Sequence, residues 1–321
     1  MGMLVDGQWQ DVWYDTDSNE GRFVRESARF RHWVTPDGAA GATGDSGFAA
    51  ASGRYHLYVS LACPWAHRTL IVRALKGLEA LIDVSVVSPL MLENGWTFHR
   101  DEGSTGDKVG GADFHHQVYT RADPTYTGRV TVPVLWDRER NTIVSNESAD
   151  IIRMFNSAFN DITGNTLDLY GPSERAAIDD WNARIYPAIN NGVYRAGFAT
   201  TQQAYEEAYH ALFEELDHID AHLAHQRYLT GATLTEADIR LFTTLIRFDA
   251  VYHGHFKCNR QRLEDYLAGY IRDIYQRPGV ADTVDFHHIK THYYASHRNI
   301  NPTGVVPVGP DIDYTSAHGR R

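Results

Sequence analysis

Cys63 has the surroundings best suited to chemistry in this chain. Residues 55–60 alternate apolar and polar side chains as a strand does, and Pro64 favours the first turn of a helix. Cys63 is therefore expected at a helix N-terminus, where unpaired N–H groups and the helix dipole favour a thiolate. His67 and Arg68 would add positive charge nearby. The pattern predicts a nucleophilic thiolate; the alternative is a buried structural cysteine, because free cysteine is often buried.

The motif holds a single thiol. The position three residues after Cys63, where a dithiol redox pair would have its second cysteine, is Ala66. We therefore expect a mixed disulfide with a small external thiol instead of an internal disulfide.

A proline near the start of a later strand suggests a binding segment. The run VTVPVLWD (130–137) contains Pro133, which cannot donate to a β-ladder. A cis bond between Val132 and Pro133 would leave the Val132 backbone free to pair with an extended, peptide-like ligand. The alternative is an ordinary trans proline at a strand edge.

Three other positions could line such a site. Ser148 and the neighbouring N–H groups at a helix start form a carboxylate site, or else an ordinary N-cap. Trp96 and Arg129 lie in a long polar stretch, residues 88–130. Long loops are often functional, so both side chains could line a site. Trp96 could instead pin the loop to the body, and Arg129 could be a solvated surface charge.

Composition excludes several classes of protein. The chain has 321 residues, a net charge of −11 and two cysteines. This acidic balance argues against a nucleic-acid binder or an anionic-membrane binder. The cysteines show no disulfide framework, which suits a cytoplasmic protein. We expect no secretory signal and no membrane span.

The order of elements predicts two folded parts. Residues 1–50 read as an extension on the body, and residues 51–160 as β-α-β, the insertion 88–130, then β-β-α. This is thioredoxin-like connectivity, in which a cysteine follows the first strand and a proline precedes the third. Residues 161–321 read as an all-helical domain with an extended tail, 296–321. Within it, Thr235 and Asp238 predict a helix N-cap worth ~1 kcal/mol.

At this point the sequence resembles a known family. The motifs CPWAHR, ENGWTF, VTVPVLWD, SNES and HYYASHRNINPTG look like those of the glutathionyl-hydroquinone reductases, also called xi-class or omega-like glutathione transferases. The resemblance covers nearly the whole chain. It implies a thioredoxin-like domain followed by an all-helical glutathione-transferase domain, and a homodimer.

The resemblance also implies roles for individual residues. Cys63 matches the nucleophile, and Tyr194 and Tyr293 match tyrosines of the hydroquinone site, although Tyr294 stands beside Tyr293. The remaining matches are glutathione contacts at Trp96, Arg129, Val132, Glu147 and Ser148, with Pro133 completing the Val132 segment.

The implied reaction is reduction of glutathionyl-hydroquinones with glutathione as co-substrate. Cys63 would attack the glutathione sulfur, and a second glutathione would resolve the mixed disulfide. No metal, flavin or nicotinamide is expected. The His253-Gly254-His255 run with Cys258 lacks a fourth zinc ligand, and Cys258 is expected to be inert. We expect His115-His116 and His287-His288 on the surface or in loops.

Two alternatives use the same features. A monothiol also suits a general thiol transferase or dehydroascorbate reductase. A non-catalytic glutathione-transferase-like module is the third possibility, and the intact Cys63 argues against it.

Overall fold

The computed structural model describes residues 2–100 and 103–320, which form two compact units. The chain contributes three separate segments to each unit. Unit 1 consists of residues 1–13, 26–167 and 283–296, and unit 2 of residues 14–25, 168–282 and 297–321. No helix within the described residues is long and apolar enough to cross a membrane.

A four-stranded sheet lies at the centre of unit 1, in the order β4-β3-β8-β9. The strands are β3 (Tyr55–Val59), β4 (Asp83–Val86), β8 (Val134–Asp137) and β9 (Thr142–Ser145). β3 runs parallel to β4 and antiparallel to β8, and β8 and β9 form the predicted hairpin. Every residue of β3 is buried, as expected for a strand whose two faces are both covered.

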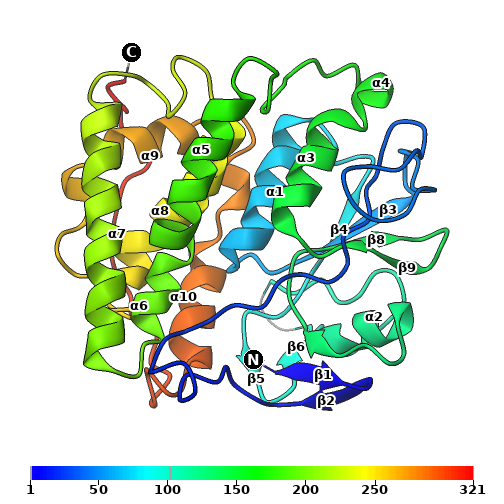
Figure 1. Ribbon diagram of the computed structural model, residues 1–321, viewed down its shortest axis with the longest axis horizontal. Coiled ribbons are helices and arrows are strands. Elements are labelled where there is room, and N and C mark those ends of the chain that lie inside the picture. The colour runs from blue at the N-terminus through cyan, green and yellow to red at the C-terminus, as the bar shows by residue number, and fades with distance from the viewer. Residues whose placement is uncertain (1, 101–102, 321) are drawn as a thin grey trace. The chain divides into compact units, whose positions relative to one another are not determined.

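Two helices of unit 1 follow strands of this sheet. Helix α1 (Pro64–Leu75) lies beside α3 (Ser148–Ser157), as Figure 1 shows. Their order around the strands is the predicted β-α-β, β-β-α sequence, which confirms the thioredoxin-like connectivity. Cys63 is the N-cap of α1 and Glu147 the N-cap of α3, so both helix starts lie directly after a strand or turn of the sheet.

The insertion 88–130 is more regular than we expected. It holds β5 (Met91–Leu92), β6 (Gly95–Trp96), α2 (His115–Ala122) and β7 (Gly128–Arg129). Strands of two residues are too short to show a period of two, so no sequence pattern predicted them. The N-terminal strands β1 (Met3–Val5) and β2 (Gln8–Gln10) join β7 in a sheet of order β2-β1-β7. The N-terminal extension is therefore bound to the insertion.

The expected exposure of two histidine pairs is wrong for one member of each. His115 and His288 are both fully buried. His115 begins α2 and turns inward, and His288 lies in α10 (Phe286–Ser296).

Helix α10 belongs to unit 1 although it comes near the end of the chain. Ser296 Oγ accepts a hydrogen bond from the Met91 N–H at 3.0 Å, and His292 stacks on Trp96. The sequence analysis had assigned residues 286–296 to the all-helical domain, residues 161–321. Helix α4 (Asn160–Thr163) is a further short element of unit 1.

Unit 2 is built from helices, as predicted. They are α5 (Arg175–Ile185), the π-helical turn η1 (Tyr186–Asn190), α6 (Gly192–Gly197), α7 (Gln202–Leu223), α8 (Glu236–Arg247), the π-helical turn η2 (Phe248–Tyr252), η3 (Leu263–Asp265) and α9 (Ala268–Tyr275). A last turn, η4 (Ala281–Thr283), leads out of the unit.

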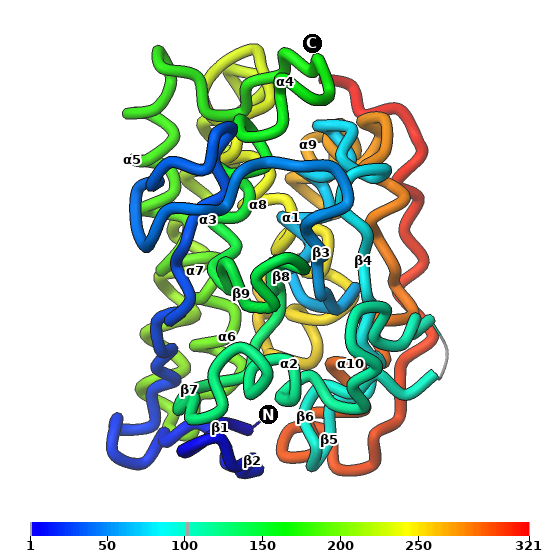
Figure 2. Tube along the Cα trace, turned by 90° about the vertical axis from the view of Figure 1, so that its right-hand side faces the viewer, coloured from blue at the N-terminus to red at the C-terminus, as the bar shows by residue number. Residues whose placement is uncertain are grey.

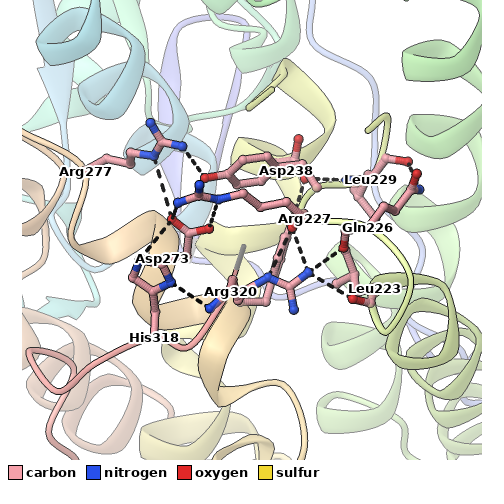
Figure 3. Close-up of polar contacts among 11 residues, drawn as sticks. Leu223, Gln226, Arg227, Leu229, Asp238, Asp273, Arg277, His318 and Arg320 are labelled. Atoms are coloured by element: carbon pink, nitrogen blue, oxygen red, sulfur yellow. Dashed lines mark hydrogen bonds and ion pairs between the residues drawn. The ribbon is translucent and has the colours of Figure 1, made fainter. Parts of the chain in front are cut away.

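The C-terminal tail lies along α9 in Figure 2, where it is drawn in red. The Gln276 amide donates to the Tyr314 and Ser316 carbonyls at 2.8 and 2.7 Å. The Tyr314 ring contacts that of Tyr275, with centroids 5.3 Å apart. Close to its end, Arg320 donates to the carbonyl of Leu223, the last residue of α7, and to the Gln226 and Arg227 carbonyls in the segment that follows (Figure 3).

Candidate active site

Cys63 lies where a helix begins beside the proline segment. It is half-buried, and its carbonyl accepts from the His67 N–H at 3.0 Å, which starts α1. Pro64 occupies the first turn, as predicted. The Cys63 Sγ lies 3.5 Å from the Val132 carbonyl oxygen, across the gap between α1 and the strand that follows Val132. The thiol is thus held at the positive end of a helix dipole, next to a backbone segment that precedes a strand.

The Val132–Pro133 peptide bond is cis, which decides between the two alternatives that the sequence left open. Both residues are buried, and β8 begins directly after them at Val134. The Val132 carbonyl accepts from the Cys63 thiol. Within residues 2–100 and 103–320, no group accepts a hydrogen bond from the Val132 N–H.

The proposed site has two parts: the segment of Val132 and Pro133 beside Cys63, and the start of α3, where the sequence predicted a carboxylate site. A Glu147 carboxylate oxygen accepts from the Ala149 N–H at 3.0 Å, so Glu147 is the N-cap. Ser148 is the first helical residue and is buried. Its hydroxyl accepts a hydrogen bond from the Arg68 guanidinium at 3.3 Å.

Arg68 is a functional candidate whose position the sequence did not give. We expected it to add charge near Cys63, but its guanidinium reaches Ser148 and lies 4.5 Å from the Trp65 ring centroid. It is 1% exposed. Arg68 therefore places a buried positive charge at the start of α3. A charged residue inside the apolar stretch of α1 was the available signal, because buried charges need partners.

Two predicted contacts have partners in other parts of unit 1. Arg129 is 9% exposed and donates to the Val12 carbonyl and, at 3.0 Å, to the Trp13 carbonyl. It also lies 3.5 Å from a Glu26 carboxylate oxygen. The Trp96 ring stacks on His292 with centroids 4.7 Å apart, and its backbone pairs with Met91.

The candidate tyrosines of α10 differ in burial. Tyr293 is 1% exposed, and its ring meets that of His292 edge-on at 5.1 Å. Tyr294 is half-buried. Both belong to unit 1, as Cys63 does.

Tyr194 belongs to unit 2, where it lies in an aromatic cluster. Its ring centroid is 5.6 Å from that of Phe256 and 6.0 Å from that of Tyr252. The Arg25 guanidinium lies 5.1 Å from the Tyr194 ring centroid and donates to the Asn191 side chain at 3.1 Å. A cation over an aromatic face is attracted to it. The sequence did not identify Arg25 or Tyr252 as neighbours of Tyr194.

The histidine and cysteine run of unit 2 is packed into its core. Cys258 is fully buried, and burial raises the pKa of its thiol far above the ordinary value. His255 stacks on His297, with ring nitrogens 3.2 Å apart, and burial lowers the pKa of His255 to about 4. Among residues 2–100 and 103–320, no group of three His, Cys, Asp or Glu side chains is placed to hold a metal ion.

Comparison with known proteins decides the family. The model of the glutathione S-transferase N-terminal domain matches residues 62–158, and that of the C-terminal domain matches residues 202–273. The chain is 58% identical over 323 residues to glutathionyl-hydroquinone reductase YqjG of Escherichia coli K-12, covering 100% of this chain and 98% of that protein. The chain belongs to the glutathionyl-hydroquinone reductase family.

Other members of the glutathionyl-hydroquinone reductase family and xi-class structures agree. The reductase PcpF of Sphingobium chlorophenolicum is 54% identical, over 97% of this chain and 96% of that protein. The glutathione-bound structure of YqjG matches at TM-score 0.92 and 56% identity, covering 99% of each chain. A xi-class glutathione transferase from Natrialba magadii matches at TM-score 0.93 and 51% identity, covering 100% of this chain and 97% of the other.

Proposed function

We propose that this protein reduces glutathionyl-hydroquinones to hydroquinones with glutathione as the reductant. The observation that carries the proposal is the placement of the Cys63 Sγ at the start of α1, 3.5 Å from Val132. The family supplies the substrate class, since YqjG and PcpF are both named glutathionyl-hydroquinone reductases.

Glutathione would bind as an extended tripeptide in unit 1. The Val132 backbone pairs with the peptide, and cis-Pro133 sets the direction in which that backbone enters β8. The start of α3, through the Ser148 N–H and hydroxyl, donates hydrogen bonds to a carboxylate. Glu147 receives the α-amino group. The buried Arg68 charge beside Ser148 favours an anion there. Trp96 and Arg129 complete the proposed set of contacts.

In the first step the Cys63 thiolate attacks the glutathione sulfur of the substrate. The new S–S bond forms as the carbon–sulfur bond breaks, and the electron pair of that bond goes to the ring carbon, which takes a proton. The products are the free hydroquinone and a Cys63–glutathione mixed disulfide. Tyr194 and Tyr293, or Tyr294 in place of the latter, orient the phenol and relay the proton.

In the second step a glutathione thiolate attacks the glutathione sulfur of the mixed disulfide. Oxidised glutathione leaves and the Cys63 thiolate is restored. The sum is one glutathionyl-hydroquinone and one glutathione converted to one hydroquinone and one oxidised glutathione. The residues of the chain and the second glutathione account for every atom and electron, so the scheme calls for no metal, flavin or nicotinamide.

We further propose that the protein is a homodimer and acts in the cytoplasm. The chemistry consumes reduced glutathione, and Cys63 and Cys258 are both free thiols. Such a protein suits a reducing compartment.

The test is turnover of a panel of glutathionyl-hydroquinones, with release of oxidised glutathione followed in parallel. We expect Cys63→Ala to abolish both, and Cys258→Ala to leave both unchanged. Mass spectrometry after treatment with oxidised glutathione should find one glutathione adduct, on Cys63. Full activity of Cys63→Ala would refute the scheme. Faster turnover of dehydroascorbate or of simple mixed disulfides than of any hydroquinone would favour a general thiol transferase.

A further inference from the structure

The hydroxyl of Tyr119 joins two segments that are distant in sequence. Tyr119 lies in α2 of the insertion and is fully buried. Its hydroxyl donates to the Thr131 carbonyl at 2.9 Å and accepts from the Thr131 N–H at 3.2 Å. It also accepts from the Asn146 side-chain amide at 3.2 Å. One proton and the oxygen lone pairs of a single hydroxyl therefore bridge residues 131 and 146.

The Thr131 carbonyl is fixed from two sides. The His115 Nε2, one turn earlier in α2, donates to it at 3.0 Å. Burial lowers the pKa of His115 to about 4 and raises the pKa of Tyr119, so at neutral pH the imidazole is neutral and the phenol keeps its proton. Two donors thus engage both lone pairs of one carbonyl oxygen.

This arrangement determines where the next amide points. The Thr131 carbonyl and the Val132 N–H belong to one planar trans peptide unit, in which they face opposite ways. Because His115 and Tyr119 draw the oxygen toward α2, the Val132 N–H is turned away from α2. That N–H is the group proposed to pair with glutathione.

The same hydroxyl reaches the other half of the proposed site through Asn146. The Asn146 side-chain oxygen accepts from the Phe30 N–H at 3.1 Å, and its backbone N–H donates to the Phe30 carbonyl at 3.2 Å. Asn146 directly precedes Glu147, the N-cap of α3. Helix α2 contacts β9, the strand that leads into Asn146 (Figure 1).

We propose that Tyr119, assisted by His115, is a positioning residue for glutathione: it fixes the Thr131–Val132 peptide and the Asn146–Glu147 entry to α3 in one geometry. Tyr119 thereby sets the spacing between the two halves of the glutathione site without itself touching the ligand. The inference rests on the proposed function, because it takes Val132, Glu147 and Ser148 as glutathione contacts.

The test is Tyr119→Phe, which removes one oxygen and keeps the ring. It leaves the Thr131 N–H and the Asn146 amide without their acceptor, so both segments relax. We expect the dissociation constant for S-methylglutathione, measured by calorimetry, to rise about tenfold, the scale of losing one or two buried hydrogen bonds. The KM for glutathione should rise in parallel, while kcat at saturation changes less than about threefold, since Cys63 is untouched.

Tyr55→Phe is the matched control. Tyr55 is also fully buried in unit 1, and its hydroxyl donates to the Ala49 carbonyl at 2.7 Å, outside the proposed site. Both variants should lower the melting temperature, but only Tyr119→Phe should weaken ligand binding. If Tyr119→Phe does not fold, Asn146→Ala removes the hydrogen bond to Tyr119, together with that from the Phe30 N–H, keeps both contacts between Tyr119 and Thr131, and should raise the dissociation constant by about threefold.

Different results would refute the proposed function and the positioning role of Tyr119. Wild-type protein that turns over no glutathionyl-hydroquinone refutes the proposed function. Active wild-type protein with folded Tyr119→Phe and Asn146→Ala variants that bind S-methylglutathione within about twofold of wild type refutes the positioning role. An equal loss of binding in Tyr55→Phe would also refute it, because the effect would then be general destabilisation.

Discussion

Replacing Asp238 by alanine is expected to destabilise unit 2 by about 3–5 kcal/mol, well beyond the value of an ordinary helix cap. Asp238 is fully buried near the start of α8, and its carboxylate accepts four hydrogen bonds. Two come from the N–H and hydroxyl of Thr235, at 2.9 and 3.0 Å. The others come from the Leu229 N–H at 2.9 Å (Figure 3) and from the Tyr270 hydroxyl at 2.7 Å.

The magnitude follows from the donors that alanine would leave behind. The Leu229 and Thr235 N–H groups and the Tyr270 hydroxyl would all lose a buried acceptor, and each such loss costs about 1–3 kcal/mol. Removal of a buried charge offsets part of the total, because that charge is itself unfavourable in the core. Thr235→Ala removes only one hydroxyl and should cost about 1 kcal/mol.

Urea denaturation of both variants, followed by helical circular dichroism, measures the difference. The free energy of unfolding of Asp238→Ala should fall by at least twice as much as that of Thr235→Ala. Equal and small losses for the two variants would show that the carboxylate acts as a simple cap, and that its contacts with Leu229 and Tyr270 contribute little.

Three further outcomes are expected. Arg320→Ala should lower the stability of unit 2 by about 1–2 kcal/mol in the same assay, because it removes the donors to one carbonyl at the end of α7 and two in the segment after it. An unchanged unfolding midpoint would contradict this. Stability should fall as the pH drops from 6.5 toward 4, because the folded state keeps three histidines neutral whose pKa burial lowers to about 4, while the unfolded chain protonates them. The three residues are His56, His115 and His255, and protonation of each in the unfolded chain lowers the free energy of unfolding by up to about 3 kcal/mol. Urea midpoints measured between pH 7 and pH 5 should therefore decline steadily, and a flat profile would contradict the prediction. Iodoacetamide should alkylate native protein once, on Cys63, because burial raises the pKa of the Cys258 thiol and hides it; modification of Cys258 at a comparable rate, seen by peptide mass mapping, would show the core to be open.

The sequence was informative where a local pattern determines local structure. The alternation in β3, the proline after Cys63 and the hairpin of β8 and β9 are each encoded within about ten residues, and each was correctly predicted. The insertion was not, since its strands gain their order by pairing with β1 and with each other across the chain. Burial of His115 and His288 depends on the same long-range packing.

In the candidate site, too, features that depend on neighbouring residues could be predicted, whereas contacts between distant residues could not. Cys63 at its helix start followed from neighbouring residues, whereas for Pro133 the neighbouring residues left a cis and a trans bond open and the structure shows the cis form. The Arg68 to Ser148 bond joins positions 80 residues apart; the apolar surroundings of Arg68 indicated a buried charge but not which residue would be its partner. The hydrogen bond between Asn146 and Tyr119 joins positions 27 residues apart, and no sequence pattern predicted it.

The way the chain alternates between the two units bears on how the protein is made. The backbone passes from one unit to the other five times, at residues 13/14, 25/26, 167/168, 282/283 and 296/297. The last segment of unit 1 carries His292, the stacking partner of Trp96, and the candidate Tyr293. A ribosome that has released only the first 167 residues has therefore not yet supplied α10, and the half of the molecule that bears the thiol can be finished only when synthesis is almost over.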